Sequence, residues 1–95
     1  MITLIKGAKR NVGMGVSRLK NEDFTISGVT CEVFNVSHAL IEEGLGIIDG
    51  HNVYYYLDTS QDHFEIKKNY RVYFSVEIAG TLKVLKDFIE VRIER

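Results

Sequence analysis

The sequence predicts an all-β domain, and three observations lead to this prediction. Apolar and polar residues alternate with a period of two, most clearly in residues 70–78, where every even position is apolar or aromatic. Turn-forming residues recur about every ten positions, which is the spacing of strands in a β-sandwich or barrel. No window contains three turns of helical periodicity, and the best candidate, residues 37–44, is too short.

The first half of the chain contains three segments with the composition of strands. Residues 2–6 form the first, which ends at Gly7. Residues 12–16 form the second and alternate apolar side chains with small ones. The polar run at residues 21–23 predicts a turn, and residues 24–36 follow it as extended chain with a Ser-Gly pair in the middle.

The second half of the chain continues this pattern. Residues 45–48 are apolar, and the Asp49-Gly50 pair that follows them is a strong turn signal. The next expected strand covers residues 51–58, and residues 59–69 form a polar connection around Phe64 and Ile66. With the carboxy-terminal hairpin described next, the chain holds about seven or eight short strands, most of them antiparallel.

Residues 70–78 and the last segment of the chain predict a hairpin, because a short Gly-containing connection joins them. The second arm has a defect in its alternation. Leu82 and Val84 are in the even phase, whereas Ile89, Val91 and Ile93 are in the odd phase. Since neighbouring side chains point to opposite faces, we expect a β-bulge or bend near Asp87 and irregular pairing within residues 85–88.

The 95 residues are enough for one domain, which we expect to span residues 1–95. A composition of 45% hydrophobic and 26% charged residues is that of a globular protein and argues against disorder. The inward positions of the strands predict the core: Leu4, Val16, Ile26, Val29, Cys31, Val33, Val53, Tyr55, Leu57, Val72, Phe74, Val76, Ile89, Val91 and Ile93.

Charge and hydropathy exclude several kinds of partner. The formal net charge is −1, so there is no basic excess to bind nucleic acid. The amino-terminal apolar run ends at Lys6, which is short of the roughly 7–15 apolar residues of a signal peptide and the about 20 of a membrane helix. We therefore expect a chain that is not secreted through a signal peptide and has no membrane contact.

No motif in the sequence specifies a reaction. The histidines lie at positions 38, 51 and 63, too far apart for a local zinc motif, and Asp49, Asp58 and Asp62 lack a calcium-loop pattern. We therefore expect the three histidines to be surface loop residues and the three aspartates to be turn-forming residues. No nucleophile is flanked by a base, and the lone Cys31 is expected to be a buried small hydrophobe. We expect no catalytic residue, no cofactor and no metal.

The candidate binding residues are tyrosines. If Val53, Tyr55 and Leu57 face the core, Tyr54 and Tyr56 face outward, and the phase of residues 70–78 turns Tyr73 outward as well. If the two strands pair in one sheet, the three rings form an exposed patch. Such a patch suits a protein interface, sugar stacking, or simple cross-strand packing on a solvated sheet, and all three interpretations remain open.

A resemblance to a known family lies in four segments of the chain: residues 24–34 (FTISGVTCEVF), 48–58 (IDGHNVYYYLD), 70–74 (YRVYF) and 89–93 (IEVRI). In this order they resemble phage immunoglobulin-like β-sandwich domains, including the amino-terminal domain of baseplate upper proteins. The resemblance implies an immunoglobulin-like sandwich of seven to eight strands. The chain ends at Arg95 without the long remainder of those proteins, so we expect a small accessory role.

The same resemblance implies a function. The implied function is that of a non-enzymatic structural or assembly protein of a phage or prophage particle. Such a protein is expected in the host cytoplasm during assembly or in the virion. Its partners are expected to be copies of itself and other phage structural proteins, because pairing the open edges of a sandwich around a ring satisfies unpaired backbone groups. The alternative is a carbohydrate-binding module that uses Tyr54, Tyr56 and Tyr73 as a stacking platform.

Overall fold

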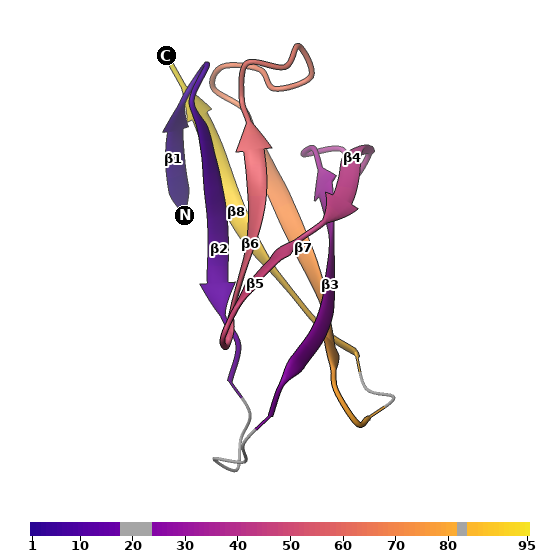
Figure 1. Cartoon of the computed structure of the whole chain (residues 1–95). Helices are drawn as coiled ribbons and strands as arrows, with labels where there is room; N and C mark the ends of the chain where they lie inside the picture. Colours follow the sequence, from indigo (N-terminus) through magenta and orange to yellow (C-terminus); the bar gives the residue numbers. More distant parts are fainter. Residues whose placement is uncertain (18–23, 82–83) are drawn as a thin grey trace.

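A computed structural model describes residues 1–17, 24–81 and 84–95 (Figure 1). The turn expected at residues 21–23 and the side chain of Leu82 lie outside this part of the chain. The described residues form strands and turns without a helix, which confirms the all-β prediction, and no helix among them could span a membrane. The strands are β1 (Ile2–Ile5), β2 (Lys9–Gly15), β3 (Ile26–Phe34), β4 (Leu40–Leu45), β5 (Ile47–Asp49), β6 (Asn52–Asp58), β7 (Asn69–Ile78) and β8 (Val84–Glu94).

The strands form two sheets that pack face to face in a sandwich-like arrangement (Figure 1). One sheet has the order β1-β8-β7-β3-β4 and the other has the order β2-β6-β5. Neighbouring strands are antiparallel except for β1, which runs parallel to β8 and pairs with its last residues. Among the residues that the structure describes, no further strand pairs with the end strands of either sheet, so their lateral edges are open.

The core lies between the sheets and is built from the inward positions of the alternating strands, as the sequence predicts. All the predicted core residues are buried except Val16 and Ile89, which are half-buried and pack against the core. The structure adds four residues that the prediction left out: Val12, Phe64, Tyr70 and Ile78.

The pairing of β7 with β8 corrects the expected irregularity near Asp87. The register is continuous from the pair Asn69–Arg92 to the pair Glu77–Val84, so the bulge prediction is wrong. The odd phase runs through the whole strand, and Leu85 rather than Val84 packs against the core. Asp87 belongs to this inward phase but remains exposed, because it lies where the edge of the sandwich is open.

The chain passes from one sheet to the other at Gly46, between β4 and β5. Its N–H donates to the carbonyl oxygen of Val29 at 2.9 Å. A Cβ atom at position 46 would lie 2.6 Å from Cγ1 of Val29 and 3.1 Å from Sγ of Cys31. The crossing therefore packs directly on the core face of β3, and only glycine fits there.

The connection between β6 and β7 closes one end of the sandwich as an ordered loop. Phe64 is buried in it, and its ring packs edge-on against Tyr70. The Tyr70 hydroxyl accepts a hydrogen bond from the N–H of Glu65 at 2.7 Å and donates one to the carbonyl of His63 at 3.1 Å. Lys6 Nζ donates to two loop carbonyls at 2.8 Å and 2.6 Å, which ties this loop to the end of β1.

Candidate interaction surfaces

The three candidate tyrosines lie on the outer faces of two different sheets. Tyr54 and Tyr56 project from β6 in the three-stranded sheet, and Tyr73 projects from β7 in the five-stranded sheet. A single patch of the three tyrosine rings would require β6 and β7 to pair in one sheet, but the two strands belong to different sheets. The alternation of a strand identifies the outward side chains correctly, but it does not say which sheet the strand joins.

Tyr73 is the centre of an aromatic row on the five-stranded sheet. Its ring meets Phe34 edge-on, with centroids 5.3 Å apart, and Phe88 at 5.1 Å. The Arg71 guanidinium lies 4.8 Å above the Phe88 ring and 3.5 Å from the carboxylate of Glu90. Because these contacts half-bury the Tyr73 ring, cross-strand packing accounts for this residue.

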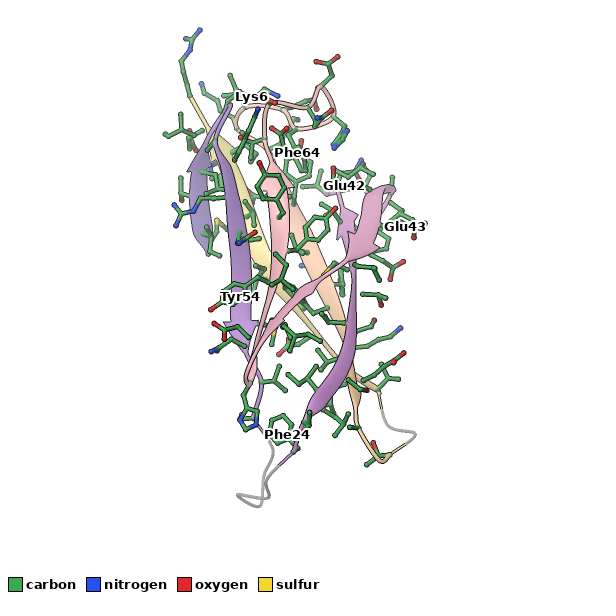
Figure 2. The ribbon with its side chains drawn as sticks, viewed as in Figure 1. Lys6, Phe24, Glu42, Glu43, Tyr54 and Phe64 are labelled. Carbon is green, nitrogen blue, oxygen red and sulfur yellow. The ribbon has the colours of Figure 1, made fainter. Side chains whose placement is uncertain are left out.

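Tyr54 and Tyr56 differ in their surroundings. The Tyr54 ring covers Gly13, the residue opposite it on β2, so closely that a Cβ atom there would lie 2.4 Å from the ring. On its other side Tyr54 pairs with Ile47 of β5. Tyr56 is 54% exposed. Figure 2 shows Tyr54 among the side chains of the three-stranded sheet. Of the two rings, Tyr56 is the one available to a partner.

Of the exposed large apolar residues in the described part of the chain, four lie within residues 40–49, which we name the β4–β5 edge. Leu45 is 81% exposed, and Leu40, Ile47 and Ile48 are between 41% and 46% exposed. β4 is the end strand of one sheet and β5 the end strand of the other. This segment therefore combines exposed apolar side chains with the open backbone of two edge strands, a combination typical of interaction sites.

A hydrogen-bonded chain holds the β4–β5 edge in place. Glu42 of β4 accepts a 2.7 Å hydrogen bond from the Tyr55 hydroxyl, and its other carboxylate oxygen lies 2.7 Å from Nε2 of His63. Burial, and then the hydrogen bond and charge of Glu42, raise the pKa of Tyr55, so the phenol stays protonated at neutral pH. The edge is thus joined to β6 and to the β6–β7 loop, and it is preformed.

The remaining candidate ligands are dispersed over the molecule. His51 stacks on Phe24 with ring centroids 4.0 Å apart, and its Nε2 lies 2.8 Å from the Phe24 carbonyl. Asp58 accepts hydrogen bonds from the hydroxyl and N–H of Ser60, which lower its pKa. Among the residues that the structure describes, no three histidine, cysteine or acidic side chains are grouped so that they could hold a metal ion.

Cys31 is buried on β3 beneath Gly46, as the sequence predicts. Burial raises the pKa of its thiol from 9.0 to about 11. The thiolate, the reactive form, is therefore scarce in the native protein at neutral pH.

We expect iodoacetamide to alkylate native Cys31 at about pH 8 roughly a hundredfold more slowly than the urea-unfolded chain, as measured by mass spectrometry. Because the pKa is raised by folding, the stability that the protonated thiol contributes is complete below pH 9 and is lost as the pH rises through 11. Equal alkylation rates in the native and unfolded chain would show that the thiol is accessible.

Comparison with known proteins returned no family model, no curated protein and no solved structure that matches this chain.

Proposed function

We propose that this chain is an immunoglobulin-like sandwich domain and a non-enzymatic structural component of a phage or prophage particle. In this proposal it acts through protein–protein contacts, assembles with copies of itself and with other phage structural proteins, and is present in the host cytoplasm during assembly. The β4–β5 edge is its contact surface.

The strand order supports the immunoglobulin-like fold. If β2 is taken as strand B, the sheet β2-β6-β5 corresponds to the order B-E-D. The neighbours β8-β7-β3-β4 then correspond to G-F-C-C′, the second sheet of such domains. The hydroxyl of Tyr70, the second residue of β7, binds the backbone five and seven residues upstream, which is the arrangement of a tyrosine corner.

The observation that carries the protein-binding role is the exposure of the β4–β5 edge. Leu45 is 81% exposed, and three further apolar residues of the same ten-residue segment are more than two-fifths exposed. Covering these side chains and the open strand edges with another protein removes apolar surface from water and pairs free backbone groups. The phage setting rests on the resemblance of residues 24–34, 48–58, 70–74 and 89–93 alone.

Light scattering after size-exclusion chromatography tests this role. The wild-type chain is expected to elute as a multiple of its 10.9 kDa mass, and Leu45→Ser with Ile47→Ser to elute as a monomer. Tyr54→Ser with Tyr56→Ser is the matched control, since it removes one half-buried and one exposed ring from the outer face of the three-stranded sheet, and its mass should not change. A wild-type monomer at high concentration would contradict the proposal.

A carbohydrate-binding role is the second candidate, and the exposure of Tyr56 favours it. Tyr56 offers the exposed ring on which a sugar can stack, and Tyr54, two residues away on the same face, is half-buried over Gly13. An affinity gel distinguishes the roles: retardation by one glycan that Tyr56→Ala abolishes would support sugar binding, whereas equal mobility on all glycans would exclude it.

A further inference from the structure

We propose that copies of this chain associate head to tail, so that the β4–β5 edge of one copy packs against the opposite lateral edge of the next. We name that opposite side the β2–β8 edge; it consists of residues 9–17 and 84–90. The inference rests on the proposed self-association and specifies the two surfaces that meet.

The β2–β8 edge is open and contains an apolar cleft. β2 is the end strand of its sheet, and β1 pairs with β8 only from Val91 onward. On the side away from β7, residues 84–90 therefore have no strand beside them among the described residues. A cleft of about 240 Å³ lies between the two sheets at this point, lined by Met14, Val16, Phe74, Val76 and Leu85, with Lys86 and Asp87 at its rim.

The pairing registers place the apolar side chains of one edge level with the cleft of the other. In the five-stranded sheet, Leu45 is opposite Thr30, which is opposite Ser75, which is opposite Lys86. Leu45 and Lys86 thus lie in one row across the sheet.

The three-stranded sheet gives the same alignment. Ile48 is opposite Val53, and Val53 is opposite Met14. A second copy placed beside the first with its strands in the same direction therefore brings Ile48, which is in the core-facing phase, next to the cleft. Leu45 shares the outward phase of Thr30 and Ser75, so it comes to lie beside Lys86 on the outer face of the five-stranded sheet, with little shift along the strands.

The charges of the two edges are complementary. Lys9 and Arg10 are exposed at the start of β2. Glu43 and Asp49 are exposed on the β4–β5 edge, and Figure 2 shows Glu43 on β4. Side-by-side packing in this register puts Asp49 level with Gly15, whereas Lys9 and Arg10 lie five to six residues further along β2. The complementarity is therefore between the overall charges of the two edges, and it steers the copies together.

Two-fold association through like edges is less favourable. Antiparallel pairing of two β4 strands about their midpoint places Glu42 or Glu43 opposite the same residue of the second copy. Pairing of two β8 strands centred on Lys86 or Asp87 also opposes like charges, and a register centred on Phe88 runs into β1. Unlike edges therefore meet, and such a contact repeats into a ring or a filament.

A mixing experiment tests the arrangement with two full-length variants, each blocked at one edge by exposed substitutions. Leu45→Arg blocks the β4–β5 edge, and Lys9→Gln with Arg10→Glu blocks the β2–β8 edge. Each variant alone is expected to sediment as a monomer, with self-association weakened about tenfold or more. An equimolar mixture is expected to form a 1:1 dimer and nothing larger, because one intact edge of each kind remains.

The controls separate this inference from the proposed function. Ile66→Arg changes an exposed apolar residue outside both edges and should keep the wild-type mass, and thermal unfolding shows that every variant folds. If the Lys9→Gln, Arg10→Glu variant keeps the wild-type mass while Leu45→Arg is monomeric, copies join through the β4–β5 edge alone, and only the head-to-tail arrangement is wrong. A mixture that stays monomeric also overturns it. If Leu45→Arg keeps the wild-type mass, both proposals are wrong.

Discussion

Replacing Gly46 by valine is expected to destabilise the native state by about 3 kcal/mol, the upper part of the range for overpacked cores. A Cβ atom there would lie 2.6 Å from a methyl group of Val29, 3.1 Å from the sulfur of Cys31 and 3.1 Å from the carbonyl oxygen of Tyr54. The two side chains on β3 and the backbone carbonyl on β6 cannot all move away, so β4 and β5 must shift. Urea unfolding followed by circular dichroism measures the change.

Gly44 is the matched control for this substitution. It lies two residues away on β4 and is exposed, and its Cβ would make an ordinary contact with the Tyr55 ring at 3.6 Å. Gly44→Val is therefore expected to change the free energy of unfolding by no more than about 0.5 kcal/mol. If Gly46→Val is as stable as Gly44→Val, the chain does not cross between the sheets against the core.

Truncating Phe64 to alanine is expected to cost about 3–5 kcal/mol, the usual range for a fully buried phenylalanine. Only 1% of the Phe64 surface is exposed, and its ring packs on Tyr70 and lies beside His63. The cavity cannot collapse easily, because hydrogen bonds from Lys6 and to Tyr70 hold the loop around it. The midpoint of urea unfolding reports the loss.

Ile66→Ala is the control for this substitution, since Ile66 belongs to the same loop and is 38% exposed. Its effect is expected to stay within about 0.5 kcal/mol of zero. A Phe64→Ala protein with nearly wild-type stability would mean that the loop does not close the end of the core.

The parts of the fold that the sequence predicts are those in which local alternation decides the outcome. In β7, side chains at even positions must face one way, so burying Val72, Phe74 and Val76 together follows from the pattern. Where the sequence does not alternate, it does not indicate which side chains are buried. Phe64 appears in a polar connection, and its burial depends on a loop geometry fixed by distant Lys6 and Tyr70.

The β8 prediction was wrong for a related reason. The bulge was inferred because apolar Leu82 and Val84 are in the opposite phase to Ile89, Val91 and Ile93. The exposed edge of a sandwich tolerates both an outward valine and an inward-phase Asp87, so no phase change is needed. Near an open edge, burial no longer forces each side chain to the face that suits it.

The candidate interaction surface required the tertiary structure. The outward directions of Tyr54, Tyr56 and Tyr73 follow from the alternation, but pairing partners depend on contacts distant in the sequence. The β4–β5 edge was hidden because residues 45–48 look like one buried strand. In the structure the chain crosses from one sheet to the other at Gly46, so Leu45 ends β4 and Ile47 begins β5. The apolar residues on either side of Gly46 remain exposed at two sheet edges.

The parallel pairing of β1 with β8 has a mechanical consequence. The four residue pairs from Ile2–Val91 to Ile5–Glu94 lie side by side, and the N–H of Lys6 adds a further bond to the carbonyl of Glu94. A pull on the start of β1 against the end of β8 loads these bonds in shear, all at once, instead of opening them one after another as a zipper. Tension along the long axis of the molecule is thus resisted collectively.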